Sequence, residues 1–311
     1  MDVVTGIMAT AFLAGGVLAL AALGEVLAER VGIVNLGVEG LMAMGAITAI
    51  AVVTATPNPF LGFVVALLMG VVLGGMFAVA TVYCQANQVL CGLALTLMGT
   101  GLSGAIGKAY SGLPARATFD AVAVPYLSDL PVIGRAFFSQ NVLVYLIYLI
   151  LPFAFHYLLF KTRHGLNMRA VGENPAAADA AGIPVHAIRF GYVCAGAALA
   201  AGAGAYLTLA FVPGWTEGVI AGRGWIAVAL VIFAGYRPWN AVMAALLFGV
   251  ITSIGFVGQA RNWPVEPALL STLPYLGTIA FIIIPVIASQ KIKRRMAAPA
   301  ALGVPYFRDM R

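Results

Sequence analysis

Charged residues are scarce in this sequence. Only 9% of its 311 residues are Asp, Glu, Lys or Arg, whereas 62% are hydrophobic. A soluble domain carries about 25% charged residues and needs them to build a surface that faces water. This scarcity excludes a soluble globular protein of this length and predicts that lipid surrounds most of the chain. The net charge of +6 lies in loops beside apolar stretches, so it indicates membrane orientation, and we expect no nucleic-acid partner.

Residue types that make catalytic or cofactor sites are also few. Three cysteines lie in or beside apolar stretches, and three histidines are scattered, so no spacing typical of a metal site is present. The sequence has no Gly-x-x-x-x-Gly-Lys-Ser/Thr motif for nucleotide phosphates, no His-Glu-x-x-His and no Gly-x-Ser-x-Gly. We therefore expect no enzyme active site, no metal and no cofactor, and any ATP hydrolysis would take place on another chain.

Long apolar runs are abundant instead. Six windows contain no Asp, Glu, Lys or Arg, namely 3–24, 40–107, 136–160, 190–216, 238–260 and 267–290. A membrane helix needs about 20 such residues, and backbone in lipid must make its hydrogen bonds within the helix. Turn formers at 56–59 and polar residues at 85–88 divide the longest window into three.

The windows predict an all-α, polytopic transmembrane bundle of about nine spans. The expected spans are 3–24, 40–55, 60–83, 88–107, 141–160, 190–211, 223–236, 240–258 and 273–288. Segment 223–236 is short for a full crossing, and 40–55 is also short and follows the unusual stretch 25–40. The segments 25–40 and 212–236 are therefore either full spans or broken or re-entrant helices, which protein surroundings permit. Abundant glycine inside the spans predicts close helix packing.

The distribution of Lys and Arg predicts the orientation. Basic residues cluster in loop 161–189 and in the tail 291–311, and nine spans place twelve of the 17 Lys and Arg on that side. Because basic loops stay in the cytoplasm, we expect the C-terminus inside and the N-terminus outside. The chain then consists of a transmembrane domain, 1–290, and a basic cytoplasmic tail, 291–311.

Loop 161–189 contains the signals of a short helix. Asn174 is a good N-cap, Pro175 suits the first helical position, alanines follow, and Gly182 and Pro184 end the helix. We expect about two turns lying along the membrane, with small side chains that suit docking into another protein. An ordinary interspan loop is the alternative. The residues assigned to this docking segment are Gly172, Glu173, Asn174, Pro175, Ala176, Ala177, Ala178, Asp179, Ala181 and Gly182.

Three further blocks carry a family resemblance. They are 24–40 (GEVLAERVGIVNLGVEG), 222–235 (GRGWIAVALVIFAG) with Arg237-Pro-Trp, and 299–308 (PAALGVPYFR). With the alanine-rich segment, they resemble permease subunits of ABC importers for nucleosides and simple sugars, which are relatives of the ribose and branched-chain amino acid permeases. The blocks extend over nearly the whole chain.

The resemblance implies an architecture and a set of partners. It implies a type II importer bundle in a bacterial inner membrane, with the segment at 174–182 as a coupling helix. It also implies a separate ABC ATPase subunit, a second related permease subunit, and a periplasmic or lipoprotein binding protein. That binding protein would deliver nucleosides, purines or simple sugars from outside.

The charged stretch 25–40 supplies candidates for the pathway. Glu25 and Glu29 share one helix face, and Arg30 can neutralise one of them only if the geometry allows. Ionisable groups at membrane depth are usually functional, but a hydrated cytoplasmic interface explains these equally well. The residues predicted to border the translocation pathway or its inner gate are Asn35, Gly37 and Glu39.

Two features on the predicted outer side are weaker signals. Glu217 and Arg223 are candidates for docking a binding protein or gating the outer mouth, and a hydrated pair is the alternative. Loop 108–140 is rich in aromatic residues, which would cap the bundle, meet the binding protein or anchor at the membrane interface. An ion-driven secondary transporter is the alternative function, although neither an inverted repeat nor a midplane ionisable site is evident.

Overall fold

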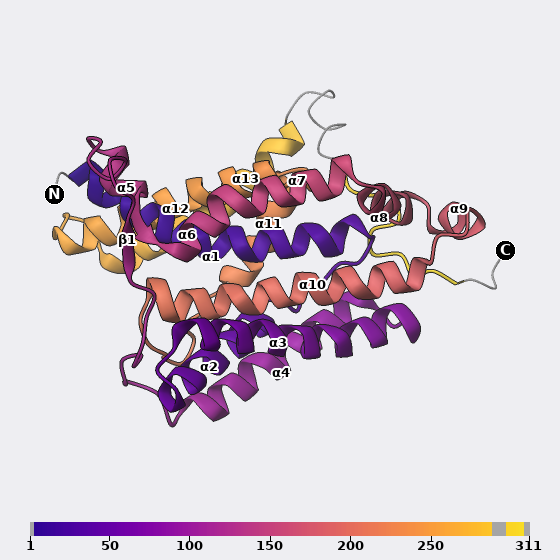
Figure 1. The fold of residues 1–311 in the computed structure, drawn as a ribbon, viewed down its shortest axis with the longest axis horizontal. Helices are drawn as coiled ribbons and strands as arrows, with labels where there is room; N and C mark the ends of the chain where they lie inside the picture. Colours follow the sequence, from indigo (N-terminus) through magenta and orange to yellow (C-terminus); the bar gives the residue numbers. More distant parts are fainter. Residues whose placement is uncertain (1–2, 288–296, 308–311) are drawn as a thin grey trace.

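The computed structural model describes residues 3–287 and 297–307, and the structural statements below concern that part of the chain. The helices run along the longest axis of the molecule (Figure 1). Seven helical segments are long and apolar enough to cross a membrane. They are α1 (Val3–Arg30), α2 (Val38–Ala55), α3 (Pro59–Ala78) with η1 (Val79–Tyr83), α4 (Gln88–Gly107), α6 (Val142–Tyr145) with η2 (Leu146–Ile150) and α7 (Leu151–Lys161), α10 (Val185–Tyr206) with η3 (Leu207–Phe211), and α12 (Pro238–Ala260).

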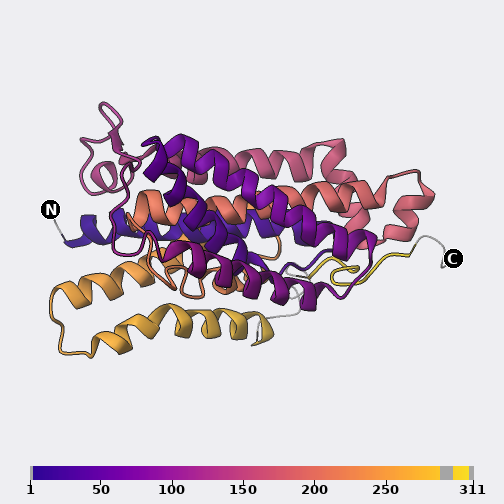
Figure 2. The same cartoon turned by 90° about the horizontal axis from the view of Figure 1, so that it is seen from below.

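Two further apolar helices, α11 (Arg223–Phe233) and α13 (Pro267–Ile287), lie in the same bundle. Figure 2 shows α12 and α13 side by side along one edge. The 11 residues of α11 extend only about 16 Å at 1.5 Å per residue, roughly half of a 30 Å hydrocarbon core. The predicted polytopic helical bundle is therefore confirmed, and α11 alone is too short to cross it.

The breaks within the longest apolar window follow local capping rules. The Asn58 side chain accepts hydrogen bonds from two backbone N–H groups in the first turn of α3 (3.0 and 3.2 Å). Asn87 caps α4 in the same way through one N–H (3.1 Å). Each cap satisfies donors that have no partner within the helix. The structure thus confirms the breaks predicted at 56–59 and 85–88.

The centre of the bundle is α10, which contacts α1, α2 and α3. Small residues make these contacts close. A Cβ atom at Gly24 of α1 would overlap the backbone of Gly196, and one at Gly45 of α2 would overlap the backbone of Ala201. Glycine therefore lets these helix backbones touch, which confirms the close packing predicted from the composition.

Residues 108–141 fold over the end of the bundle at which α1 begins (Figure 1). They contain the antiparallel strands β1 (Ala121–Ala123) and β2 (Ser139–Asn141) and the short helix α5 (Ile133–Phe137). The side chains of Phe119 and Phe137 are buried, whereas Tyr126 is 90% exposed. At least two of the aromatic residues in this segment therefore cap the bundle.

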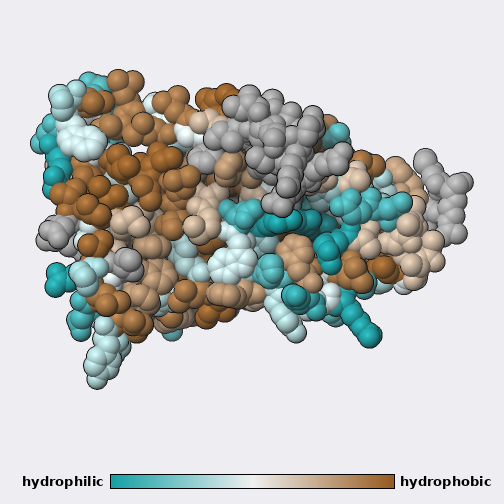
Figure 3. Space-filling model, turned by 90° about the horizontal axis from the view of Figure 1, so that it is seen from above, coloured by the Kyte–Doolittle hydropathy of each residue, from teal (hydrophilic) through white to brown (hydrophobic). Residues whose placement is uncertain are grey.

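The opposite end carries α8 (Arg163–Glu173), α9 (Pro175–Ala180) and residues 297–307 (Figure 1). The Ala301 N–H donates to the Gly172 carbonyl (2.9 Å), and the Gly303 N–H donates to the Gly32 carbonyl (3.1 Å). Part of the predicted tail thus packs on the helix ends, while the basic run 291–295 lies outside the described residues. On the face in Figure 3, a broad hydrophobic zone separates hydrophilic atoms at the left edge from a second hydrophilic group in the right half of the view.

Candidate functional site

Non-helical backbone interrupts two of the segments that run through the bundle. Residues 31–37 separate α1 from α2, and residues 212–222 separate η3 from α11. Gly40, in the first turn of α2, packs directly against Gly99, near the middle of the 20-residue helix α4. The helix α2 therefore begins beside the middle of α4, and non-helical backbone precedes it.

Glu39 connects the starts of α2 and α11. One of its carboxylate oxygens accepts a hydrogen bond from the Gly222 N–H (2.8 Å), and the other accepts from the Gly224 N–H (2.7 Å). A carboxylate at this position satisfies free donors of the first turn and offsets the partial positive charge of the helix start. A Cβ at Gly224 would lie 2.5 Å from the Glu39 backbone nitrogen, so the contact requires glycine.

Side chains from neighbouring helices satisfy the backbone of residues 31–37. The Asn35 N–H donates to the Glu25 carboxylate of α1 (3.0 Å), and the Val34 N–H donates to the Gln88 side-chain carbonyl of α4 (2.8 Å). Buried backbone donors without partners would destabilise the fold, so these bonds make a non-helical segment possible inside the bundle.

The three predicted pathway residues have different positions. The side chain of Asn35 is buried and accepts a hydrogen bond from the Gly37 N–H (2.9 Å), which forms a local turn leading into α2. Asn35 and Gly37 therefore shape the backbone at the start of the helix. Glu39 is 8% exposed and lines a cavity described below.

Glu25 and Glu29 are not at a hydrated interface, since each is only 2% exposed. Arg30 does not neutralise either carboxylate by a hydrogen bond. Its Nε donates to the Tyr236 carbonyl (2.8 Å) and its Nη2 to the Gly235 carbonyl (3.4 Å), beyond the C-terminal end of α11. A cation suits the partial negative charge of a helix end, so α11 has a carboxylate at its start and a guanidinium at its end.

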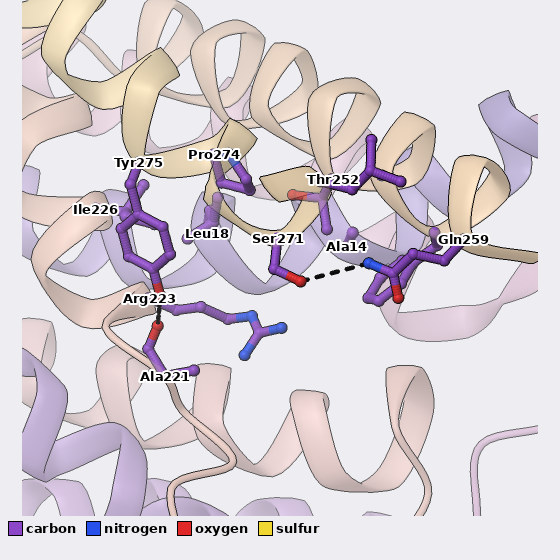
Figure 4. Close-up of a pocket in the computed structure, with 13 residues that line it drawn as sticks. Ala14, Leu18, Ala221, Arg223, Ile226, Thr252, Gln259, Ser271, Pro274 and Tyr275 are labelled. Atoms are coloured by element: carbon purple, nitrogen blue, oxygen red, sulfur yellow. Dashed lines mark hydrogen bonds between the residues drawn. The ribbon is translucent and has the colours of Figure 1, made fainter. Parts of the chain in front are cut away.

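A cavity of about 230 Å³ lies between α1, α11, α12 and α13 (Figure 4). Arg223, the first residue of α11, extends its guanidinium into this cavity. The Tyr275 hydroxyl donates to the Ala221 carbonyl (2.5 Å), and the Gln259 amide donates to the Ser271 hydroxyl (3.4 Å). The remaining lining is largely apolar, so this cavity combines a hydrophobic wall with one cationic group.

A second cavity of about 70 Å³ lies between α2, α4 and residues 215–221. Ala221 lines both cavities, so the segment 212–222 separates them. The polar side chains around the smaller cavity are Glu39, Thr100, Ser103, Trp215, Thr216 and Glu217. Its lining is therefore acidic and hydroxyl-rich, in contrast to the larger cavity.

Within residues 3–287 and 297–307, no ion pair joins Glu217 to Arg223, which the sequence suggested as a pair on the outer side. Arg223 donates through Nη1 to the carbonyls of Val219 and Ile220 (2.9 and 3.0 Å), and the carboxylate that acts on it electrostatically is Glu39. Glu217 is exposed, whereas Arg223 is half-buried at the start of α11.

The predicted short helix is present as α9. Asn174 accepts a hydrogen bond from the Ala177 N–H (3.0 Å), Pro175 is the first helical residue, and Gly182 has a φ of +79° just beyond the end. The residues assigned to the docking segment 172–182 differ in exposure. Gly172 and Ala178 are buried, Asp179 is half-buried, and the exposed members are Glu173, Asn174, Ala176, Ala177, Ala181 and Gly182.

Sequence reasoning identified Glu39 and Arg223 separately but did not connect them through the start of α11. It missed Thr100, Ser103 and Trp215 altogether. Hydroxyl residues within a long apolar window are a weak signal, because a membrane helix tolerates them wherever they bond to its own backbone. Only the fold brings them together with Glu39.

Comparison with known proteins gives consistent results. The model of a family described as the permease component of the branched-chain amino acid transport system matches residues 7–284. A protein of Haloferax volcanii named "Putative glucose ABC transporter permease protein TsgC13" is 38% identical over the full length of both chains.

Two bacterial relatives are similar over almost as much of their length. The nucleoside ABC transporter permease protein NupC of Lactococcus lactis is 34% identical, over 92% of each chain. The guanosine ABC transporter permease protein NupQ of Bacillus subtilis is 33% identical, over 94% of each chain. No solved structure matches the chain.

Proposed function

Because the chain belongs to the permease family of the branched-chain amino acid transport system, it is a permease subunit of an ABC importer, and we propose that it carries nucleosides or purines. Two relatives that cover more than nine-tenths of the chain are named for nucleosides or guanosine. Simple sugars are the second candidate, because the 38% identical relative is named for glucose. The observation that carries the proposal is this similarity along the whole chain.

The proposed mechanism is alternating access driven by a separate ATPase subunit. Closure of that subunit on ATP would push α9 and tilt the helices on either side of it. Exposed alanines on α9 leave a surface of small side chains at one end of the bundle, which supports a docking role. A nucleotide can shift such an equilibrium only through contacts that differ between the two states, and α9 is where the proposal places them.

The proposed arrangement in the membrane has α8, α9 and the C-terminal residues in the cytoplasm and the start of α1 outside. It has nine spans in the inner membrane of a bacterium, with residues 212–222 and α11 together forming one of them, and a type II importer architecture. A second, related permease subunit would complete the pathway beside Glu39. An external binding protein would dock at the end formed by 108–141, with Glu217 as a candidate contact.

The test uses Ala177→Trp in the complete transporter reconstituted in liposomes. A bulky side chain on α9 should reduce solute uptake at least about tenfold while ATP hydrolysis becomes insensitive to the binding protein, because the push no longer reaches the bundle. The matched control is Ala268→Trp, which alters an exposed alanine on α13 and should leave uptake unchanged. Normal uptake by the Ala177→Trp protein would contradict the docking role.

The solute is tested separately with the unaltered transporter. We expect ATP-dependent uptake of guanosine that unlabelled nucleosides compete away and glucose does not. Uptake of glucose alone would select the second candidate. Uptake that follows a proton gradient without ATP would contradict the ATP-driven mechanism.

A further inference from the structure

The smaller cavity, between α2, α4 and residues 215–221, has hydrogen-bonding capacity that the fold does not use. It lies beside Thr100 and Ser103 in the C-terminal half of α4. That half of α4 is nearer to the end of the bundle at which α1 begins. Its volume of about 70 Å³ exceeds several times the 10–15 Å³ that one water molecule requires. There is room for a few water molecules, or for a pair of solute hydroxyl groups, but not for a whole nucleoside.

Most of the free capacity consists of acceptors. The Ser103 hydroxyl donates its proton to the Ala43 carbonyl (3.0 Å), and the Thr100 hydroxyl donates to the Thr96 carbonyl (2.8 Å). Their protons are therefore committed to the backbone, while lone pairs on both oxygens remain. A group that binds here must donate hydrogen bonds.

Glu217 adds an ionisable acceptor to this wall. One of its carboxylate oxygens lies against α4, 3.9 Å from the position that a Cβ would occupy at Gly104. No hydrogen bond or ion pair of Glu217 is found within residues 3–287 and 297–307. Glu39, on the opposite wall, already accepts two backbone hydrogen bonds, each through a different oxygen. Glu217 accepts no such bond within the described residues, so it is the carboxylate with the greater free acceptor capacity.

Trp215 closes one side of the cavity without offering it a donor. Its side chain is only 3% exposed, and its indole nitrogen has no surface open to the cavity. The polar atoms that a ligand can reach are therefore mainly acceptors, and a sugar hydroxyl group can donate a hydrogen bond to such acceptors.

We propose that this cavity binds the vicinal hydroxyl groups of a sugar ring as the solute passes, with Glu217, Thr100 and Ser103 as acceptors. The inference rests on the proposed function and makes it more specific. Nucleosides and glucose, for which the relatives are named, share a ring with adjacent hydroxyls although they differ elsewhere. One subsite for that shared part would serve both kinds of solute.

The test compares two solutes that differ only in these hydroxyls. Initial uptake of guanosine and of 2′,3′-dideoxyguanosine is measured at saturating solute in liposomes that contain the complete transporter, ATP and the binding protein. The unaltered transporter should prefer guanosine. In Glu217→Gln and in Thr100→Val the guanosine rate should fall about three- to tenfold, as expected for the loss of one hydrogen bond to a charged or neutral acceptor, with the dideoxy rate unchanged.

Matched controls are available on the same end of the molecule. Glu266→Gln changes an exposed glutamate outside the cavity, and Thr272→Val changes an exposed threonine whose hydroxyl also bonds to its own helix, at Leu269 (2.7 Å). Neither should alter the ratio of the two rates. If the transporter takes up glucose and not guanosine, the same ratio is measured with glucose and 2-deoxyglucose.

Several outcomes would overturn the subsite. The first is an unchanged ratio of guanosine to dideoxyguanosine uptake in both Glu217→Gln and Thr100→Val. The second is an equal fall in the uptake rates of both solutes. The third is a Na⁺ requirement for uptake that disappears in Glu217→Gln, which would identify a cation site instead. An equal loss together with weaker binding of the external protein would assign Glu217 to docking. Failure of the unaltered transporter to take up guanosine or glucose would contradict the proposed function rather than the subsite.

Discussion

The two non-helical stretches inside the bundle, 31–37 and 212–222, are held in different ways. The first is buried for most of its length and is fixed by side chains from two helices, including Glu25 and Gln88. The second is largely exposed and has a cavity on each side. Its bonds to neighbouring helices include those of Glu39 at its end and of the Tyr275 hydroxyl.

This difference indicates which stretch can move. A segment with few buried contacts opens at a lower free energy than a segment whose backbone is bonded inside a core. We therefore expect 31–37 to act as a fixed support and 212–222 to change position during transport. Substitutions at the first stretch should lower stability, and substitutions at the second should lower transport.

The largest effect is expected where the two stretches meet. Gly224→Ala places a Cβ against the Glu39 backbone, so α11 must move away from α2. Overpacking of this kind costs about 3 kcal/mol, and transport should fall about tenfold or more. The control is Gly191→Ala on α10, where a Cβ meets no other atom within 4 Å. Thermal unfolding measures the change in stability, and uptake measures the change in transport. If Gly224→Ala altered neither, the contact between α2 and α11 would not link the two stretches.

An intermediate effect is expected at the support. Glu25→Ala leaves the buried Asn35 N–H without its acceptor, which should lower the free energy of unfolding by about 2 kcal/mol. Glu25→Gln retains an acceptor oxygen and should recover most of that loss. Transport per folded molecule should match the unaltered protein in both variants. Reduced transport at full stability would show that 31–37 also moves.

The smallest effect is expected at the edge of the mobile stretch. Tyr275→Phe removes one hydrogen bond to the Ala221 carbonyl, worth about 1 kcal/mol, and should slow uptake about threefold because 212–222 is held less well. Tyr126→Phe, at a side chain that is 90% exposed, is the control. If Tyr275→Phe lowered the unfolding temperature without changing uptake, then 212–222 would affect only stability, as is expected for 31–37.

Local chemistry made much of the fold predictable. The long apolar windows correspond to helices, and asparagine side chains start α3, α4 and α9 where the sequence placed them. These features depend on residues within a few positions of one another. The helix α8 was not foreseen, because its sequence is polar and its position depends on packing against α7.

The candidate site could be predicted only in part, because its contacts join distant parts of the chain. Glu39 was identified as functional, but its bonds to residues 183 and 185 positions away depend on how α2 and α11 meet. The sequence left open whether Arg30 neutralises a neighbouring glutamate, and the structure shows it bound to carbonyls more than 200 positions away. Sequence spacing reveals which residues share a helix face, and it carries no information on which helix ends face each other.

The glycine and alanine surface of α10 has a mechanical consequence. Large interlocking side chains resist sliding, because each must change rotamer before its helix can shift past a neighbour. Where α10 touches α1 and α2 through bare backbone, that resistance is low, and small shear displacements become accessible. Only residues 181–184 separate α9 from α10, and η3 at the far end of α10 leads into 212–222. A force on α9, the proposed docking helix, would thus shift α10 along its own axis and displace the segment 212–222 between the two cavities.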